Sequence, residues 1–288
     1  MNHPIRIIPR LDIKGSNLVK GVNLEGLRVL GSPHRFAKYY YEQGADELFY
    51  QDVVASLYGR NSLKKMITNT AENIFIPLTV GGGIRNVTDI SEILRSGADR
   101  VSINSAAVKN PKFITEAAEK FGRSTIVISI EAIEQKNGNY LVFTESGRNC
   151  SGKDVFQWAR QTEKLGAGEI VLTSVDKEGK GEGMNIQLVE EIVKLVDIPV
   201  VSNGGIGKKE HCTEILKAVP VSGLSIGSMF HYEYLSKKNF DFERSQEGNI
   251  EYLKKKLTPS NIIQCNISTL KKELVKNKIH CRFDEKNI

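Results

Sequence analysis

Two stretches of this sequence, PLTVGGGIRN at residues 77–86 and VSNGGIGKKE at residues 201–210, follow the same plan. In each of them a short apolar run leads into glycines and then into a charged segment of helical composition. Gly204 lies 122 positions after Gly82, which is close to half the length of a (β/α)-barrel of about 250 residues. The chain therefore carries the same order of elements twice: a strand, a glycine turn and the start of a helix. The two glycine turns, at Gly82–Gly83 and Gly204–Gly205, are called here the glycine corners.

Other segments repeat at nearly the same distance, which indicates an internal duplication. GADELFYQD begins at Gly44, and GAGEIVLTS begins at Gly166, again 122 positions later. VSINSAA and LSIGSMF align Ser105 with Ser228, which are 123 positions apart. Several matches at one spacing predict two similar halves related by a pseudo-twofold axis.

Eight short apolar runs alternate with amphipathic segments, which is the pattern of a parallel sheet covered by helices. Eight such units favour an α/β fold closed into a (β/α)8 TIM barrel over an open doubly wound sheet. We expect strands at Ile5–Leu11, Glu47–Val53, Ile76–Val80, Arg100–Ile103, Ser124–Ile130, Glu169–Thr173, Ile198–Ser202 and Gly223–Ile226. Helices are expected between them, for example at Pro33–Gln43, Val87–Ser96, Pro111–Phe121 and Lys153–Leu165.

Residues 1–288 are predicted to form a single barrel domain with an addition near its end. The two homologous (β/α)4 halves are expected at about residues 4–122 and 123–235, and the last helix at residues 268–279. Between the second half and that helix, residues 236–267 are polar and charged and contain glycine and proline breakers. This insertion predicts a surface elaboration rather than a second domain.

The composition excludes several classes of protein. Hydrophobic residues make up 40% of the chain and charged residues 26%, which are globular values. The apolar runs have the length of strands, so no membrane span is expected. The net charge of +6 comes without aromatic-basic interleaving, so we expect no nucleic-acid partner. Four cysteines without C-x-x-C spacing predict free thiols in a cytoplasmic protein, and the scattered histidines predict no metal site.

Glycines and small polar residues follow several of the predicted strands. The carboxyl ends of barrel strands meet on the face where ligands bind, and glycines let backbone N–H groups approach an anion there. A lone glycine corner more often makes only a turn, but a symmetric pair favours two phosphate sites at one mouth. The predicted phosphate-binding residues are Gly82, Gly83, Asn104, Ser105, Asn203, Gly204, Gly205, Gly227 and Ser228.

An acidic residue ends the first strand of each half, Asp12 in one and Glu131, 119 positions later, in the other. Two carboxyl groups in one site of low dielectric constant hold different pKa values, so one can donate a proton while the other accepts it. A strand-end acid that stands alone is more often a cap or a turn former. Placed between two phosphate sites, this pair predicts general acid and base catalysis without a cofactor.

The sequence also resembles a known family. The segments RLDIKG at 10–15, DELFYQDVVAS at 46–56, GADRVSINSAAVKNP at 97–111 and GAGEIVLTSVDKEGKGEGMN at 166–185, with both glycine corners, carry the likeness. They look like the cyclase subunit of imidazole glycerol phosphate synthase, an enzyme of histidine biosynthesis. The likeness covers about residues 4–235 and resumes in the last helix.

The resemblance implies a lyase-type synthase subunit that works with a separate glutaminase subunit. Ammonia from the glutaminase enters the barrel at its N-terminal face and attacks a bisphosphorylated ribulosyl-formimino-carboxamide nucleotide at the other face. The products are imidazole glycerol phosphate and an aminoimidazole carboxamide ribotide. A substrate with a phosphate at each end accounts for the two glycine corners.

The resemblance also implies roles for single residues. Asp12 and Glu131 take the positions of the general acid and base, and Lys20 lies on a mobile first loop that closes over the substrate. The other implied residues of the mouth are Asp52, Thr173 and Glu178. The lower entrance matches an ammonia gate made of Arg6, Glu47, Arg100 and Glu169, for which ordinary structural ion pairing is the alternative.

The chain departs from the family pattern at several positions. Glu131 and Glu178 stand where the family has Asp, Arg100 stands where it has Lys, and Asn203 replaces a smaller residue. A glutamate moves the carboxylate outward by one methylene, and a misplacement of about 1 Å can cost about a hundredfold in rate. We therefore expect the Glu131 site to be slower than the family's.

Arg10 is a further departure. Strand alternation turns Arg10 and Asp12 to the same side, so Arg10 should point into the barrel if Asp12 does. A buried guanidinium group needs a partner, and Gln51 or the two mouth carboxylates are the candidates. A pair with Asp12 would lower the pKa of that carboxyl group. The alternative is that Arg10 bends away at the end of the strand.

A second function stays open at this point. A related protein could dock a glutaminase and pass ammonia to a sugar amidotransferase that makes acetamidino sugars for surface polysaccharide. Such paralogues are expected to lose the carboxylate of the first strand, and this chain keeps Asp12, which favours the cyclase. A role in binding alone would need an inert mouth, and the carboxylate pair argues against it.

Overall fold

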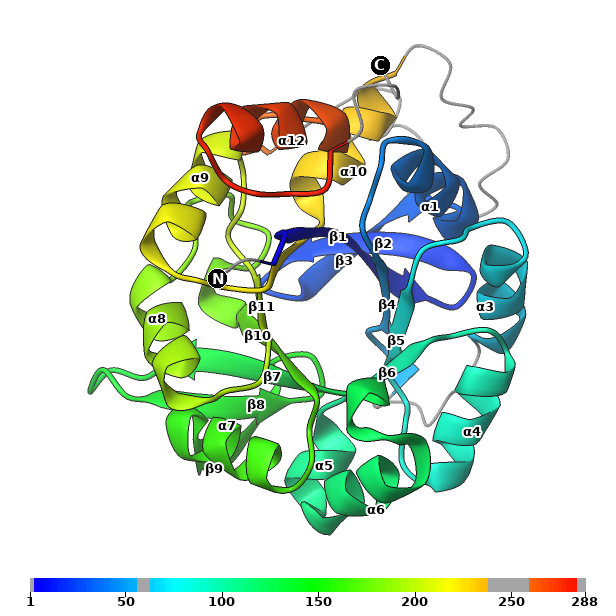
Figure 1. Ribbon diagram of the computed structural model, residues 1–288, viewed down its shortest axis with the longest axis vertical. Coiled ribbons are helices and arrows are strands. Elements are labelled where there is room, and N and C mark those ends of the chain that lie inside the picture. The colour runs from blue at the N-terminus through cyan, green and yellow to red at the C-terminus, as the bar shows by residue number, and fades with distance from the viewer. Residues whose placement is uncertain (1–2, 56–62, 238–258, 284–288) are drawn as a thin grey trace.

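A closed ring of eight parallel strands forms the centre of the molecule (Figure 1). The computed structural model describes residues 3–55, 63–237 and 259–283. The barrel strands are β1 (Arg6–Lys14), β4 (Leu48–Asp52), β5 (Leu78–Gly81), β6 (Arg100–Ile103), β7 (Ile126–Glu134), β10 (Glu169–Ser174), β11 (Val200–Asn203) and β12 (Gly223–Ile226). Each strand pairs with the next in this order, and β12 pairs with β1. The predicted (β/α)8 barrel is therefore confirmed.

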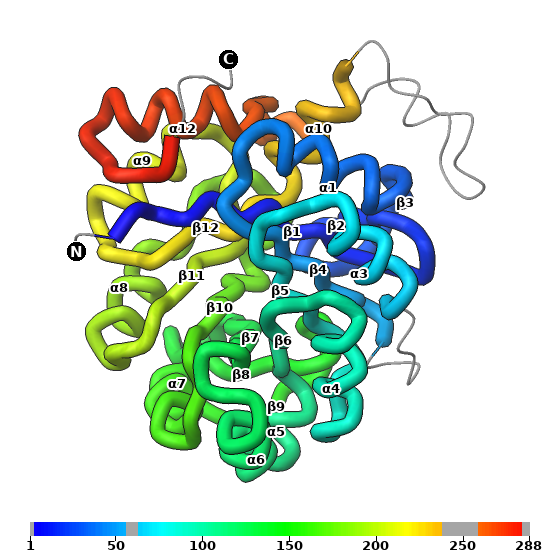
Figure 2. Tube along the Cα trace, turned by 45° about the vertical axis from the view of Figure 1, so that its right-hand side comes forward, coloured from blue at the N-terminus to red at the C-terminus, as the bar shows by residue number. Residues whose placement is uncertain are grey.

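Helices surround the ring on its outer side (Figures 1 and 2). They are α1 (Pro33–Glu42), α3 (Lys64–Ala71), α4 (Val87–Arg95), α5 (Ser105–Lys109), α6 (Lys112–Phe121), α7 (Val155–Lys164), α8 (Ile186–Leu195), α9 (Lys209–Ala218), α10 (Ser228–Ser236) and α12 (Ile267–Lys276). The side chains of Asn86, Asp154, Asn185 and Asn266 each accept a hydrogen bond from a first-turn N–H group, a cap worth about 1 kcal/mol. None of the helices in the three described ranges combines the length and hydrophobicity needed to cross a bilayer.

Two antiparallel hairpins extend the barrel, and neither was predicted. Strands β2 (Asn17–Val22) and β3 (Glu25–Gly31) continue from β1, and β8 (Tyr140–Thr144) and β9 (Asn149–Asp154) continue from β7. Their tips, Asn23–Leu24 and Glu145–Ser146, have positive φ angles at residues that are not glycine, and Gly147 follows in the second turn with a φ of 79°. The tips also lie 122 positions apart, which is compatible with the proposed duplication.

The positions of the barrel strands otherwise agree well with the prediction. Strands β6 and β12 have the predicted bounds. Strands β1 and β7 run past their predicted ends, Leu11 and Ile130, because each goes on to pair with its hairpin. The last helix, α12, lies beside α9 and α10 (Figures 1 and 2).

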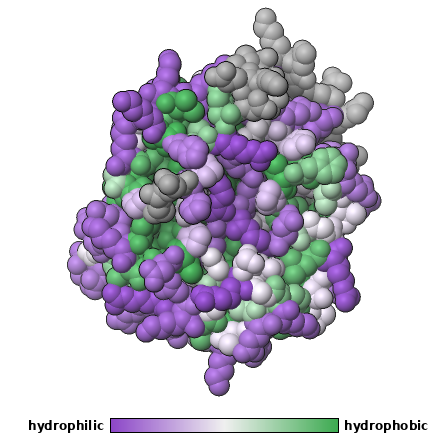
Figure 3. Space-filling view, in the orientation of Figure 1, coloured by the Kyte–Doolittle hydropathy of each residue, from purple (hydrophilic) through white to green (hydrophobic). Residues whose placement is uncertain are grey.

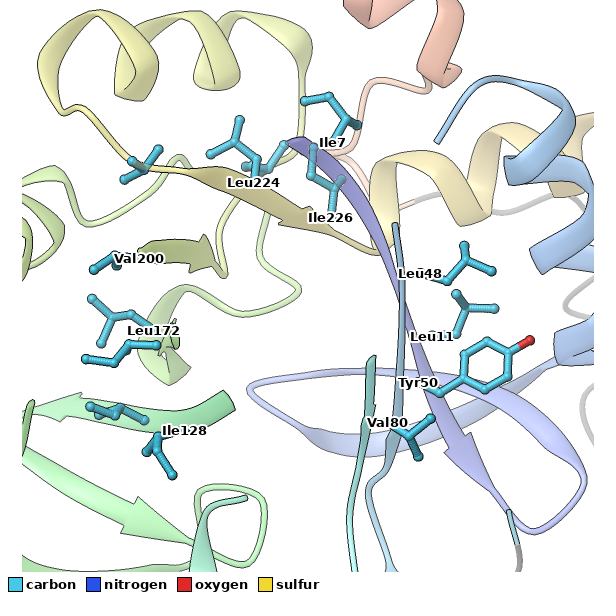
Figure 4. Close-up of a cluster of buried hydrophobic side chains, with 14 of the residues drawn as sticks. Ile7, Leu11, Leu48, Tyr50, Val80, Ile128, Leu172, Val200, Leu224 and Ile226 are labelled. Carbon is cyan, nitrogen blue, oxygen red and sulfur yellow. The ribbon is translucent and has the colours of Figure 1, made fainter. Parts of the chain in front are cut away.

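Most buried hydrophobic side chains form two separate layers, and a small third cluster consists of Val19, Val53 and Val54. The larger layer packs the outer faces of the strands against the helices, and Figure 4 shows part of it, including Ile7, Leu11, Leu48, Tyr50, Val80, Ile128, Leu172, Val200, Leu224 and Ile226. The second layer, called here the inner apolar layer, lies inside the barrel and consists of Ile8, Phe49, Val127, Val171 and Val201. The inner apolar layer separates the polar groups at the two ends of the barrel.

Part of the predicted insertion, residues 238–258, lies outside the described residues. The segment that follows it packs against the loops at the carboxyl ends of the strands. The backbone N–H of Ile263 donates to the carbonyl of Gly207 at 2.7 Å, and the side chain of Ile262 is buried. A Cβ atom on Gly181 or Gly207 would come within 2.6 Å of the carbonyl oxygen of Asn261, so this close approach requires glycine.

Candidate functional site

Four charged side chains form a closed ring at the amino ends of the barrel strands, called here the lower ring. Arg6 contacts Glu47 at 3.0 Å and Glu169 at 2.6 Å. Arg100 contacts Glu169 at 3.0 Å and also pairs with Glu47. Burial raises the pKa of Glu47 above its ordinary value, and the charges of the two arginines only partly offset this. On the face shown in Figure 3, hydrophilic residues gather over the centre of the molecule.

The change Glu47→Gln is expected to lower the free energy of unfolding by about 3 kcal/mol, because it leaves two arginines to share one buried carboxylate. Urea denaturation measures this loss. The matched control is Glu190→Gln, which breaks an exposed pair with Lys194 and should change stability by less than about 0.5 kcal/mol. Equal effects of the two changes would show that the lower ring is not a buried network.

The first glycine corner follows β5. Gly82 and Gly83 have φ angles of 98° and 71°, and a Cβ atom on Gly82 would lie 2.3 Å from the carbonyl oxygen of Asp52. The neighbouring turn after β4 is fixed by the Asp52 side chain, since its Oδ1 atom accepts hydrogen bonds from the N–H groups of Val54 and Ala55. A small pocket of about 30 Å³ opens here, and its lining includes Asp52, Gly82, Gly83, Asn104, Ser105 and Glu131.

The second glycine corner follows β11 and has the same backbone. Gly204 and Gly205 have φ angles of 99° and 98°, and Cβ atoms there would lie 2.6 Å and 2.1 Å from the carbonyl oxygens of Ser174 and Gly183. Helix α10 begins next to this corner, at Ser228. A cavity of about 580 Å³ opens at the start of α10, and its lining includes Lys20, Arg28, Gly179, Ser228, Tyr232 and Pro259, but neither Gly204 nor Gly205.

The change Gly82→Ala is expected to raise the KM for a phosphorylated ligand by about tenfold or more. The added Cβ atom forces the loop away from Asp52, so the N–H groups of the loop no longer point at the ligand. Steady-state kinetics or calorimetry measures this. The matched control is Gly138→Ala, at a turn with a φ of 81° and nothing within 4 Å of the added Cβ. Similar ligand affinities in the two variants would contradict a phosphate role for the corner.

Asp12 and Glu131 occupy equivalent places on opposite sides of the ring. Asp12 lies opposite Gln51 of the next barrel strand and pairs with its hairpin, while Glu131 lies opposite Thr173 and pairs with the other hairpin. Both side chains are buried, at 2% and 7% exposure. The charge of Arg10 acts on both carboxyl groups, so they share one interior.

Arg10 points into the barrel and pairs with Asp12, which settles the alternatives for its partner. Its Nε atom donates to Asp12 Oδ1 at 2.8 Å, and its Nη1 atom lies 3.4 Å from Thr173 Oγ1. Burial alone would raise the pKa of Asp12, but the charges of Arg10 and Lys20 outweigh it, and the pKa lies below its ordinary value. Asp12 is therefore held as a carboxylate.

The surroundings of Glu131 shift its pKa in the direction opposite to that of Asp12. Its Oε2 atom accepts one hydrogen bond, from the N–H of Gly147 at 2.8 Å. Burial raises the pKa of Glu131 above its ordinary value, and this hydrogen bond and the charge of Arg10 only partly offset it. The two acids of the mouth thus have pKa values moved in opposite directions.

Lys20 lies in β2, a strand of the hairpin that forms the connection between β1 and α1, and is 4% exposed. The hairpin strand pairs with β1 and brings the Nζ atom to 3.5 Å from Asp12 Oδ2 and into a close ion pair with Glu178. Asn203 then links Glu178 to Thr173, with both contacts at 3.2 Å. The six residues of this closed circuit, called here the upper ring, are Arg10, Asp12, Lys20, Glu178, Asn203 and Thr173.

Sequence reasoning missed two neighbours of this site. His231 of α10 is fully buried, and its Nδ1 atom lies 2.6 Å from the hydroxyl oxygen of Tyr40. Burial and the charge of Lys20 lower the pKa of His231 to about 3. Gly147, which binds Glu131, lies in the unpredicted turn after β8. A lone histidine on an apolar helix gives no signal beyond core packing, and no strands were expected on either side of Gly147.

The upper ring thus places two buried cations, Arg10 and Lys20, beside the carboxylates of Asp12 and Glu178. Within the part of the chain that the structure describes, no three His, Cys, Asp or Glu side chains are grouped so that they could hold a metal ion. The cysteines at 150, 212, 265 and 281 are free thiols.

Known proteins match most of the chain. A family model described as "Histidine biosynthesis protein" matches residues 6–236. The chain is 56% identical over 206 residues to the imidazole glycerol phosphate synthase subunit HisF of Legionella pneumophila, covering 72% of this chain and 97% of that protein. The protein of the same name from Sulfurisphaera tokodaii is 50% identical over 226 residues, 78% of this chain and 90% of that protein. The one from Clostridium botulinum strain Okra is 44% identical over 244 residues, 84% of this chain and 96% of that protein.

Proposed function

Because the chain belongs to the histidine biosynthesis protein family, with HisF subunits of imidazole glycerol phosphate synthase as its relatives, we propose that it is the cyclase subunit of such a synthase. It takes ammonia from a glutaminase partner and converts a bisphosphorylated ribulosyl-formimino-carboxamide nucleotide to imidazole glycerol phosphate and an aminoimidazole carboxamide ribotide. The three relatives are all named as synthase subunits. No comparison supports the alternative of a protein that serves a sugar amidotransferase.

The two phosphates of the substrate bind at the two glycine corners. Gly82, Gly83, Asn104 and Ser105 hold one end, and Gly204, Gly205, Gly227 and Ser228 hold the other. At each corner the backbone approaches its neighbours so closely that a side chain would not fit. This geometry supports phosphate binding, because backbone N–H groups then face the ligand unobstructed.

The middle of the substrate lies between Asp12 and Glu131. Ring closure needs a base that takes a proton from the attacking nitrogen and an acid that protonates the leaving group. Asp12, held as a carboxylate by Arg10 and Lys20, is suited to accept the proton, and Glu131, with its raised pKa, is suited to donate one. Asp52, Thr173, Glu178 and Lys20 complete the walls of the mouth.

The glutaminase partner docks on the N-terminal face of the barrel, over the lower ring. The side chains of Arg6 and Arg100 are 25% and 18% exposed, so the ring is open to a partner on that side while its carboxylates stay buried. Ammonia enters there and passes the inner apolar layer. A neutral molecule crosses such a layer far more easily than an ion does.

One observation carries the proposal: two buried carboxyl groups with pKa values moved in opposite directions lie between two matching glycine corners. The test uses the purified chain, the bisphosphorylated nucleotide and ammonium at alkaline pH, with product absorbance followed over time. Turnover is the expected result. No turnover, together with stimulation of a glutaminase, would contradict the proposal and favour delivery of ammonia to another acceptor.

A further inference from the structure

Arg10 lies between the two polar ends of the barrel, at the inner side of the mouth. Its guanidinium carbon is 5.5 Å from the centre of the Phe49 ring, and Phe49 belongs to the inner apolar layer. On the other side, its Nε atom is bound to Asp12 of the upper ring. A molecule that travels along the barrel axis from the lower ring therefore meets Phe49 and then Arg10 before it reaches Asp12.

The contacts of Arg10 hold its side chain across the barrel. The side chain comes from β1, yet its Nη1 atom lies 3.4 Å from Thr173 Oγ1 on β10. Burial alone would lower the pKa of Arg10, but the charges of Asp12, Glu178 and Glu131 outweigh it and raise the pKa, so Arg10 is always a cation. Its residue is 4% exposed. Arg10 is thus a fixed, buried positive charge at the inner side of the mouth.

We propose that Arg10 is an inner gate. It closes the ammonia passage while the mouth is empty, and it opens when the substrate binds to Asp12 in its place. This inference rests on the proposed function. The same Asp12 carboxylate that holds Arg10 must turn to the substrate during the reaction, so substrate binding weakens the contact at 2.8 Å. Arg10 then keeps the longer contact to Thr173 and the packing against Phe49, but it has lost its shortest hydrogen bond.

A gate of this kind has two physical effects. A fixed cation repels ammonium, so only neutral ammonia can pass beyond the inner apolar layer. A planar guanidinium packed against Phe49 also fills the space through which ammonia has to move. Ammonia that arrives before substrate is therefore kept inside the barrel rather than lost through the mouth.

The first test compares glutamine consumption with product formation in the complex with a glutaminase, at substrate concentrations from well below to well above KM. The native complex should form product and glutamate in a constant ratio. In Arg10→Leu the ratio should fall as substrate decreases, to about half when half of the mouths are empty. The loss of Arg10 as a partner of Asp12 can also change kcat. The dependence of the product-to-glutamate ratio on substrate concentration reports loss of ammonia separately from such a change. A ratio that is independent of substrate in the variant would overturn the gate.

Two further measurements keep the outcome clear. Arg10→Lys retains the charge, so its ratio should lie nearer to that of the native chain than the ratio of Arg10→Leu does. In the native chain, exchange of the Arg10 Nε hydrogen with water, followed by NMR, should be slow in the free protein and at least about tenfold faster with the bisphosphorylated nucleotide and no ammonia source. Nucleotide binding without faster exchange contradicts the gate alone. Absence of binding contradicts both the gate and the proposed function.

Discussion

The change Asp12→Asn is expected to lower kcat of the ammonium-driven reaction by about 10² to 10⁴, the usual contribution of a general base. An amide has nearly the shape of a carboxylate but cannot accept the proton from the attacking nitrogen. Arg10 and Lys20 would also lose their shared anion, so some loss of stability accompanies the loss of rate. Steady-state kinetics with ammonium, without a glutaminase, measures the effect on the mouth alone.

A matched control separates the two consequences. The Asp46 side chain is only 8% exposed and is also paired, since its Oδ1 atom lies 2.7 Å from Lys271 Nζ and its Oδ2 atom accepts from the N–H of Ile7. Asp46→Asn should therefore reduce stability by a comparable amount and leave kcat nearly unchanged. A similar fall of kcat in both variants would show that Asp12 acts only through the fold.

The change Glu131→Gln is expected to remove the general acid and to lower kcat by about 10² or more. Glutamine can still accept the hydrogen bond from Gly147, so the loop stays in place while the proton is lost. Glu131→Asp is the matched variant, because it keeps a carboxyl group and shortens its reach by one methylene. We expect Glu131→Asp to retain far more activity than Glu131→Gln. Equal losses would mean that the carboxyl group of Glu131 is not needed.

The same variant tests the raised pKa of Glu131. A carboxyl group with a raised pKa binds its proton more tightly in the folded chain, so it destabilises the fold as the pH rises from the unfolded pKa of about 4.3 through the folded value. Glu131→Gln lacks this group. Its Tm should therefore exceed that of the native chain by a margin that grows from pH 4 to pH 8, and a margin that shrinks over this range would contradict the buried acid.

Much of the fold follows from the sequence, because it rests on spacing. The repeat distance places strands, glycine corners and the two acids in register without reference to their contacts, and the barrel confirms that order. Strand alternation likewise turned Arg10 inward, as the structure shows. Its partner could not be predicted, because Gln51 and both acids are within reach of a long side chain, and only three-dimensional packing selects Asp12.

The two hairpins could not be predicted from the repeat distance. The first tip, Asn23–Leu24, is left-handed at two residues that are not glycine, which gives no turn signal. The second tip contains Gly147 after Glu145–Ser146, but no strands were expected on either side of it. Without the first hairpin, the burial of Lys20 could not be predicted, because this residue of the connection after β1 lies in a hairpin strand. The upper ring could not be predicted either, because it depends on the first hairpin, which brings Lys20 between Asp12 and Glu178.

The central claim is that one ligand spans both glycine corners with its middle between Asp12 and Glu131. The most direct measurement is a crystal structure of the chain with the bisphosphorylated nucleotide and no ammonia source. The account predicts one phosphate at Gly82 and Ser105, the other at Gly204 and Ser228, and both carboxyl groups within reach of the atoms between them. Both phosphates on one side of the mouth, or a ligand whose middle lies away from the two acids, would contradict it.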